Sequence, residues 1–355
     1  MKPVPAPKLE LIRAGTVIPA TPLALDSKLR FDERRQRALL RYYIDAGAGG
    51  VAVGMHFTQF EIRRPGIDLY EPVMRLCGEE MDRLAKSRGR EVIKVAGING
   101  PTDSAVKQAE LAAELGYDVG IVSLAVFKDA LDQELIHHVR QIANVIPVFG
   151  FYLLTEVGGI YLSYRFWREL VEIDNLIGIK IAPFDRYGTI DVVRALYDSG
   201  REDRITLYTG NDDSILYDLV TPFAFGGGGG RTIEIKGGLL GQWGCWTKRA
   251  VELLDRVKAW RASGEPLPRE MLTLSAQITD ANAAVFDAPH EFAGSIPGVH
   301  EVLRRQGLLE GTWTLKPDEV LAPGQAEEIE RVCRAYPHLT DDAFVAENLE
   351  RWLNE

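Results

Sequence analysis

The chain has 355 residues, of which 46% are apolar and 26% charged, and its 41 Lys and Arg against 51 Asp and Glu give a net charge of −10. A chain of this length buries enough surface to fold without a disulfide or a structural metal. Its acidic balance argues against binding to nucleic acid or to an anionic membrane surface. The three cysteines, Cys77, Cys245 and Cys333, lie far apart in the sequence, which indicates neither a disulfide framework nor a metal-binding motif. No apolar run approaches the roughly 18 residues of a membrane span. We therefore expect a cytoplasmic protein that acts on a small molecule.

Short apolar runs alternate with amphipathic stretches over the first two thirds of the chain. The runs that predict strands are Thr16–Ala20, Gly50–Val53, Val92–Ala96, Val119–Ser123, Ile146–Phe151, Leu176–Ile181 and Ile205–Tyr208. The stretches that predict helices between them are Asp32–Ala46, Thr102–Leu115, Leu131–Ala143, Ser163–Ile173 and Thr189–Ser199. This alternation predicts βαβ units and a parallel sheet.

An eighth strand is expected either at Pro222–Phe225 or at Thr232–Ile235, on the two sides of the loop-like pentaglycine Gly226–Gly230. The spacing then predicts a (β/α)8 barrel. The alternative is an open doubly wound sheet, which usually has a glycine-rich first turn. The first turn here is Ala20–Leu23, which favours the barrel.

The last part of the chain has only helical patterns. The predicted helices there are Lys248–Ala262, Pro268–Phe286, Gly298–Gln306, Ala326–Ala335 and Asp341–Leu353. We therefore expect an N-terminal extension over residues 1–13, the barrel over 14–257 and a helical region over 258–355 that packs on the barrel.

Lys180 is the first candidate for chemistry, because active residues of such barrels follow the carboxyl ends of the strands. It lies in the apolar run Ile177–Pro183. Burial disfavours a charged amine, and a neutral lysine can form a Schiff base with a carbonyl compound. The alternative is a structural lysine whose amine reaches water. Lys94 and Lys236 also lie in strand-like runs and are alternative candidates for the reactive lysine. Tyr152 directly follows the fifth run and is a candidate for proton transfer, or a packing residue.

Several short motifs fit together. Gly178-Ile179-Lys180 follows Tyr152 by 28 residues, and Tyr152–Gly159 loosely matches a tyrosine motif. Further matches are Thr21-Pro22, Thr102–Asp118, Gly210–Asp212, Ile296–Val299 and Gly307-Leu308. In these motifs the chain resembles the dihydrodipicolinate synthase / N-acetylneuraminate lyase superfamily of class I aldolases, over about residues 14–310.

The resemblance implies a fold, a chemistry and an assembly. It implies a barrel in which Lys180 forms an imine with a 2-oxo acid or a related carbonyl substrate and Tyr152 relays protons. It implies that neither a metal nor an organic cofactor takes part, and that the chain forms a homo-oligomer, a dimer or a tetramer.

Two departures from the family pattern concern the residues that bind the substrate carboxylate. The loop Gly54–Glu61 keeps one threonine where the family has two, and Val157 stands at the position of an arginine. We therefore expect a divergent branch that is not dihydrodipicolinate synthase itself.

Polar residues after the strands are the candidates for replacing these contacts. They are His56, Thr58 and Gln59 after the second strand, Arg186 after the sixth, and Thr209, Asn211 and Asp212 around the end of the seventh. Each has a structural alternative: a hydrogen-bonded strand end for the histidine, a surface ion pair for the arginine, and a turn for the Asn-Asp pair.

Two other classes of function stay open. His56, Asp212 and Glu234 are residue types that bind divalent metals, although their spacing matches no metal motif. A barrel that binds a carbonyl ligand without turnover is also consistent with the altered carboxylate contacts.

Overall fold

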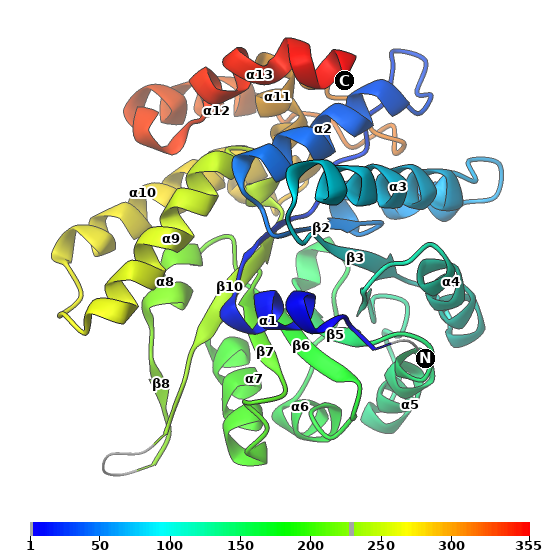
Figure 1. Cartoon of the computed structure of the whole chain (residues 1–355), viewed down its shortest axis with the longest axis vertical. Helices are drawn as coiled ribbons and strands as arrows, with labels where there is room; N and C mark the ends of the chain where they lie inside the picture. The colour runs from blue at the N-terminus through cyan, green and yellow to red at the C-terminus, as the bar shows by residue number, and fades with distance from the viewer. Residues whose placement is uncertain (1–2, 227–230) are drawn as a thin grey trace. The chain divides into compact units, whose positions relative to one another are not determined.

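The computed structural model describes residues 3–226 and 231–355. Most of the pentaglycine, Gly227–Gly230, lies outside the described residues. The main sheet consists of β1 (Val17–Pro19), β2 (Gly50–Val53), β3 (Ile93–Ile98), β4 (Val119–Val122), β5 (Val148–Leu153), β6 (Leu176–Ala182), β7 (Thr206–Thr209) and β10 (Ile235–Leu240). Its strand order is β1-β10-β7-β6-β5-β4-β3-β2. A parallel bridge from Ala20 to Ala52 joins the two ends of that order. The predicted (β/α)8 barrel is confirmed (Figure 1).

The chain divides into two compact units. One contains the chain up to Thr16 together with Ile93–Leu239, and the other contains Val17–Val92 together with Leu240–Glu355. The predicted boundaries at residues 13 and 257 stay predictions. No helix in the described part of the chain is long and apolar enough to cross a membrane.

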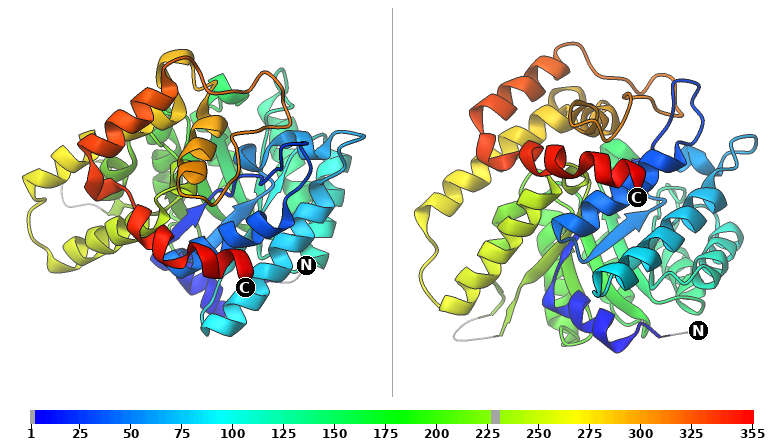
Figure 2. Two further views of the ribbon diagram at one scale, coloured as in Figure 1. Left: turned by 90° about the horizontal axis from the view of Figure 1, so that it is seen from above. Right: turned by 45° about the horizontal axis from the view of Figure 1, so that its top comes forward.

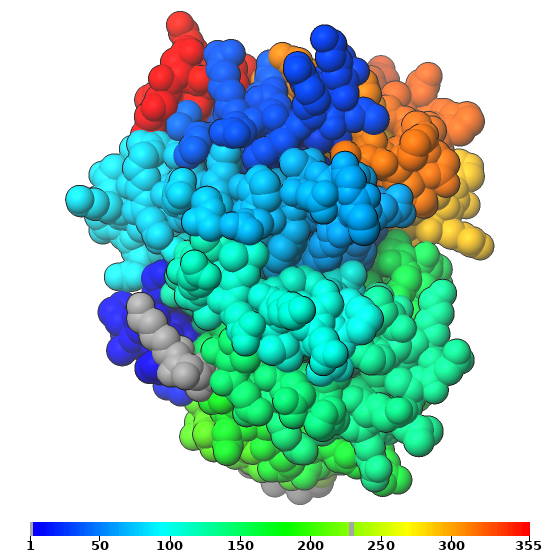
Figure 3. Space-filling model, turned by 90° about the vertical axis from the view of Figure 1, so that its right-hand side faces the viewer, coloured from blue at the N-terminus to red at the C-terminus, as the bar shows by residue number. Residues whose placement is uncertain are grey.

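In the first unit, helices flank strands β3 to β7. They are α1 (Ala6–Ala14), α4 (Thr102–Glu114), α5 (Asp132–Ala143), α6 (Tyr164–Leu170), α7 (Arg186–Ser199) and the short α8 (Ile215–Val220). Figure 1 shows α6 and α7 beside β6 and β7, and Figure 3 shows the outer surface of α4 and α5. Helix α1 lies in the predicted extension and is held by an ion pair of 2.8 Å between Lys8 and Asp118.

The interior of this unit requires glycine at one position of β6. A Cβ on Gly178 would lie 2.6 Å from Cε1 of Phe149 on β5, closer than side chains tolerate. The glycine therefore admits the Phe149 ring. The same pairing places Lys180 opposite Phe151. Six of the seven β6 residues are buried, Ile177 being the half-buried one, as expected for a strand covered on both faces.

Of the two positions predicted for the eighth strand, Pro222–Phe225 is wrong and Thr232–Ile235 overlaps the eighth strand only at Ile235. The eighth strand is β10, whereas β8 (Phe223–Ala224) and β9 (Thr232–Ile233) pair antiparallel in a separate ribbon. Glycines weaken a strand pattern unless a backbone comes close. Here it does, because a Cβ on Gly237 would lie 2.5 Å from the carbonyl oxygen of Thr16.

The second unit contains β1, β2 and most of the larger helices. They are α2 (Glu33–Ala46), α3 (Tyr70–Arg88), α9 (Thr247–Ser263), α10 (Arg269–Phe286), α11 (Ser295–Arg305), α12 (Gln325–Ala335) and α13 (Asp342–Asn354). Helix α13 lies against α2 (Figure 2). The Trp352 and Tyr42 rings are 5.5 Å apart, and Arg41 donates a hydrogen bond to the Trp352 carbonyl. The predicted C-terminal helices are thus confirmed as helices.

Candidate active site

Lys180 lies near the carboxyl end of β6 and is 8% exposed. Its register partners are Phe151 on β5 and Tyr208 on β7. The amine nitrogen Nζ lies 4.6 Å from the centre of the Phe151 ring. A Cβ on Gly210 would lie 2.5 Å from Cε of Lys180, so glycine at that position leaves room for the lysine stem. The side chain is therefore held in an apolar slot between neighbouring strands.

The slot changes the titration of the amine. Burial lowers the pKa of Lys180 from 10.5 to about 8, and the nearby Asp212 carboxylate opposes that shift. A larger fraction of the Lys180 amines is then neutral near pH 7 than for an exposed lysine. Lys180 is thus buried, held in position and more readily present as the neutral, nucleophilic amine.

The Tyr152 side chain lies on the face of β5 opposite to that of Phe151, the neighbour of Lys180. Its register partner is Ile181, not Lys180. Its ring lies 5.3 Å from the Trp167 ring, and its hydroxyl accepts a hydrogen bond of 3.4 Å from the Leu162 nitrogen. Burial raises the pKa of the phenol, which keeps it protonated. The β5 residue beside the Lys180 amine is Phe151, so proton relay by Tyr152 stays a prediction.

Three predicted substrate contacts meet instead at Asp218, a residue that the sequence analysis missed. Asp218 is fully buried in α8 and accepts hydrogen bonds from Arg186, from the Thr209 hydroxyl at 2.7 Å and from the Asn211 amide at 2.8 Å. The Asn211 amide oxygen accepts the Phe184 nitrogen. These polar groups brace the turn after β7. An aspartate within the apolar segment Ile215–Val220 was the sequence signal for this network.

Asp212 lies directly after the braced turn and is 4% exposed. It is the charged group whose field reaches the Lys180 amine. The next residue, Asp213, has its pKa raised by burial and by the Asp218 carboxylate. Of the acidic side chains at this turn, Asp212 is thus the one that acts electrostatically on the Lys180 amine.

The other predicted contacts, His56, Thr58 and Gln59, belong to the second unit. The Thr58 hydroxyl accepts a hydrogen bond from the Gly54 nitrogen and donates one to the Thr21 carbonyl oxygen. The Gln59 side chain is fully buried, and its Oε1 accepts the Leu315 nitrogen at 2.6 Å. The half-buried His56 ring packs against Phe57. Thr58 and Gln59 thus hold their loop in shape, and the substrate contacts proposed for all three stay predictions.

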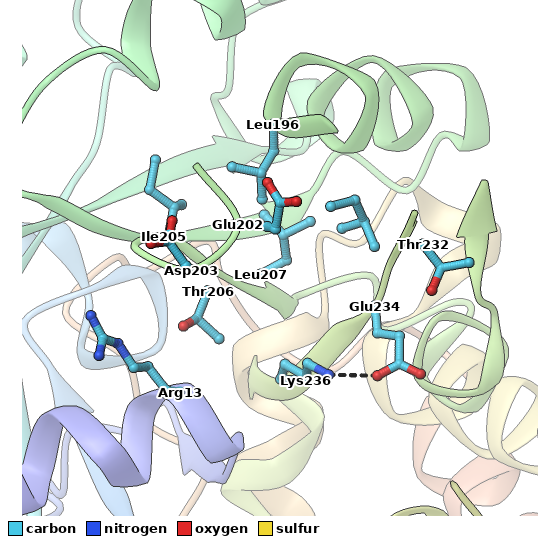
Figure 4. Close-up of a pocket in the computed structure, with 11 residues that line it drawn as sticks. Arg13, Leu196, Glu202, Asp203, Ile205, Thr206, Leu207, Thr232, Glu234 and Lys236 are labelled. Carbon is cyan, nitrogen blue, oxygen red and sulfur yellow. Dashed lines mark hydrogen bonds and ion pairs between the residues drawn. The ribbon is translucent and has the colours of Figure 1, made fainter. Parts of the chain in front are cut away.

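The rival lysines have different surroundings. Lys94 is the second residue of β3 and is 2% exposed, and its Nζ lies 5.9 Å from the centre of the Tyr117 ring. Lys236 forms an ion pair of 2.5 Å with Glu234 at the start of β10. The pair lines a cavity of about 500 Å³ at the amino-terminal ends of β7 and β10 (Figure 4). Lys236 therefore lies at the strand ends opposite to those that carry catalysis in such barrels.

The candidate metal ligands do not form a cluster. Among residues 3–226 and 231–355, no group of three or more His, Cys, Asp or Glu side chains is placed to hold a metal ion. Glu234 is instead the partner of Lys236.

The site thus consists of a buried lysine near the carboxyl end of β6 in a parallel barrel, an arrangement suited to chemistry on the lysine amine. The sequence model of the dihydrodipicolinate synthetase family matches residues 13–237, and the chain belongs to that family. It is 27% identical over 224 residues to 4-hydroxy-tetrahydrodipicolinate synthase of Synechococcus sp. (strain CC9311), across 62% of this chain and 70% of that protein.

Two further relatives extend the comparison. The chain is 28% identical over 142 residues to 4-hydroxy-tetrahydrodipicolinate synthase of Alkaliphilus oremlandii (strain OhILAs), across 39% of this chain and 47% of that protein. The match thus spans about half the length of that relative. Among solved structures, N-acetylneuraminate lyase from Fusobacterium nucleatum, complexed with pyruvate, superimposes with a TM-score of 0.70 at 18% identity, over 91% of this chain and 97% of that chain. At that identity the likeness concerns the fold.

Proposed function

We propose that the protein is a class I lyase that cleaves or forms a bond to carbon in a 2-oxo acid or a related small carbonyl substrate, through an imine on Lys180. The single observation that carries this proposal is the Lys180 amine, which is buried near the carboxyl end of β6 with its pKa lowered to about 8. Family membership supports the lyase class. The altered carboxylate contacts argue for a reaction other than dihydrodipicolinate synthesis.

The chemistry begins with the neutral amine. Its lone pair attacks the substrate carbonyl carbon, and loss of water from the adduct gives an imine. The protonated imine withdraws electrons from the adjacent carbon. A carbon–carbon bond there can break, leaving its electron pair as an enamine, and the reverse sequence forms the bond. No metal or organic cofactor is required for these steps.

Proton transfers accompany each step. We propose Tyr152 as one proton carrier, because it is the last residue but one of β5, next to β6, and its phenol is kept protonated by burial. The hydroxyl lies beside the Leu162 nitrogen, so this role requires an intervening water or a shift of the segment after β5. Asp212, whose charge already acts on the Lys180 amine, is the second carrier that the geometry supports.

Binding of the substrate uses groups around the strand ends. We propose His56, Thr58, Gln59, Arg186, Thr209, Asn211 and Asp212 as the residues that shape this binding, either directly or by holding their loops. The pyruvate complex of the Fusobacterium nucleatum lyase supports a pyruvate-like substrate. We further propose that the protein works in the cytoplasm as a homo-oligomer. Light scattering at micromolar concentration tests the latter, and a monomer only would contradict it.

Reductive trapping tests the lyase proposal. The protein is mixed with pyruvate, 2-oxobutanoate, 2-oxoglutarate or hydroxyacetone, and borohydride is added to reduce any imine to a stable secondary amine. Intact mass spectrometry should show one added substrate residue per chain for at least one compound. Ligand-induced thermal stabilisation without any adduct would instead favour a barrel that only binds carbonyl compounds. Activity that depends on an added divalent metal, again without an adduct, would favour the metal-dependent alternative.

A further inference from the structure

The cavity of about 500 Å³ at the amino-terminal ends of β7 and β10 is separate from the proposed imine site (Figure 4). Lys180 lies near the carboxyl end of β6, at the opposite ends of the parallel strands. The volume of the cavity is in the range of sites that enclose small-molecule ligands. Its wall comes from the last turn of α1, from the end of α7 and the segment that follows it, and from β7, β9 and the start of β10. The question is therefore which ligand this wall would take.

Two ion pairs fix parts of the wall. Lys236 pairs with Glu234 at 2.5 Å on the side of β10. Glu202 pairs through its Oε1 with Arg231, 3.0 Å away. The Arg231 guanidinium also lies over the Tyr197 ring, 4.3 Å from its centre. This second pair holds the start of β9 against the end of α7 and leaves one Glu202 oxygen for another partner.

Several polar groups of the lining have no protein partner among residues 3–226 and 231–355. The Thr206 side chain is 6% exposed, and its hydroxyl forms no hydrogen bond within that part of the chain. The second carboxylate oxygen of Glu202, Oε2, is buried there without a partner as well. The exposed side chains of Arg13 and Asp203 form no ion pair with any described residue. Buried polar atoms are nearly always hydrogen-bonded in proteins, so Thr206 and Glu202 point to a ligand that supplies the missing bonds.

We propose that this cavity binds a zwitterion of the size of a dipeptide, with a free carboxylate at one end and a free ammonium group at the other. The planar guanidinium of Arg13 suits a carboxylate, and the Thr206 hydroxyl donates a hydrogen bond to the same group. In the view of Figure 4, Arg13 and Thr206 lie toward one side of the cavity and Glu202 toward another. The free oxygen of Glu202 and the Asp203 carboxylate accept hydrogen bonds from the ammonium end. The inference does not depend on the proposed imine at Lys180.

The charges of the lining disfavour the simpler ligands. The wall carries two cations, Arg13 and Lys236, and three carboxylates, Glu202, Asp203 and Glu234. A ligand with only negative charge would meet the three carboxylates, and one with only positive charge would meet the two cations. A metal ion is disfavoured too, because the described residues include no group of three side chains placed to hold one. A ligand that carries both charges is complementary to both kinds of group.

Isothermal titration calorimetry of the full chain with dialanine and with glycyltyrosine tests the proposal. For the dipeptide that binds more tightly, the N-acetylated form removes the ammonium charge and the carboxamide form removes the carboxylate. Each blocked form should bind about tenfold more weakly or worse, because a charge-assisted hydrogen bond is lost.

Substitutions assign the two ends of the ligand. Arg13→Gln should weaken binding of the free dipeptide about tenfold and leave the affinity for the carboxamide unchanged, since that probe has no carboxylate. Glu202→Gln should weaken binding of the free dipeptide and leave the affinity for the acetylated form unchanged. Arg204→Gln is the matched control, because Arg204 is an exposed arginine next to Asp203 that lies outside the lining. Its removal changes net charge as Arg13→Gln does, and binding should persist.

The outcomes are distinct. No binding of either dipeptide at millimolar concentration would overturn the inference, and so would equal affinity for the free and blocked forms. That comparison uses the unmodified protein and stands even if a variant fails to fold. An equal loss in Arg204→Gln and Arg13→Gln would overturn the role of Arg13. Binding that disappears in Lys180→Arg would place the dipeptide at the imine site and overturn the assignment to this cavity, whereas the lyase proposal itself is tested by borohydride trapping.

Discussion

Two lysines at opposite ends of the barrel strands have opposite environments. Lys180 is 8% exposed near the end of β6, where burial lowers its pKa to about 8. The Lys236 side chain, at the start of β10, is 42% exposed and pairs with Glu234 at 2.5 Å. An exposed ion pair of this kind contributes at most about 1 kcal/mol to stability. The comparison teaches that burial near the carboxyl end of a strand, rather than membership of a strand, produces a nucleophile.

Lys94 sharpens the comparison further. It is even more buried than Lys180, at 2% exposure, yet it lies at the start of β3. Its backbone nitrogen donates to Asp118, and the Asp118 carboxylate also binds Lys8. Burial alone therefore does not select the reactive lysine either. The predictions below separate the three lysines and the groups around Lys180.

The largest expected effect follows from Lys180→Arg. Arginine keeps the charge and much of the bulk, but its guanidinium stays protonated and does not attack a carbonyl. We expect complete loss of borohydride trapping with a near-native circular dichroism spectrum. Lys236→Arg is the matched control and should trap at the rate of the unmodified protein. An adduct that persists in Lys180→Arg would show that another amine is the nucleophile.

Tyr152→Phe should slow imine formation without abolishing it. General acid–base help is typically worth about 10²–10⁴-fold, so a loss within that range is expected if the phenol carries protons. Stopped-flow or quenched trapping with a reactive carbonyl compound measures the rate. An unchanged rate would make Tyr152 a packing residue against Trp167, a role that their 5.3 Å ring separation also allows.

Lys180→Met should stabilise the protein while removing its chemistry. The lysine pKa falls from 10.5 to about 8 on folding, so between these pH values the unfolded chain binds more protons and the free energy of unfolding rises with pH. At pH 7 the full penalty is present, at most about 3 kcal/mol. Urea denaturation should show a gain for Lys180→Met at pH 7 that shrinks toward pH 10. Lys236→Met should show no gain at either pH, and an equal gain in both variants would contradict the comparison.

The smallest effect is expected from Asp212→Asn on the pH dependence of trapping. Burial lowers the Lys180 pKa and the Asp212 carboxylate raises it, with a net value of about 8. Removing the carboxylate should move the midpoint of the pH–rate profile below about 8. A midpoint that moves upward, or stays in place, would show that Asp212 does not act on the amine.

The sequence predicted the barrel well where local pattern and tertiary structure agree. Seven of the strands follow apolar runs, and the β6 run holds Lys180 at the predicted place. Helix α3 was missed, because Pro72 and Gly78 interrupt its helical pattern. The proline is tolerated near the helix start, where the backbone nitrogens lack partners within the helix. Strand β10 was missed because a glycine such as Gly237 weakens a strand pattern. Glycine is favoured there only because the Thr16 backbone comes close, and the sequence does not show that contact.

The candidate site was predicted less completely. The position of Lys180 could be inferred from a short motif, because the apolar residues on both sides of it predict a buried strand. The pairing of Arg186 with Asp218 could not, since it joins the start of α7 to α8 across 32 residues. The face of β5 that Tyr152 occupies depends on the register between β5 and β6, which a bulge near Phe149 shifts. Such contacts are properties of packing rather than of local sequence.

The most direct test of the central claim is the location of the trapped carbonyl adduct in the unmodified protein. After borohydride reduction with a compound from the panel, the chain is digested and the modified peptide is sequenced by tandem mass spectrometry. The account predicts a single modified residue, Lys180, within the apolar β6 segment. An adduct on Lys94 or Lys236, or one spread over exposed lysines, would contradict it.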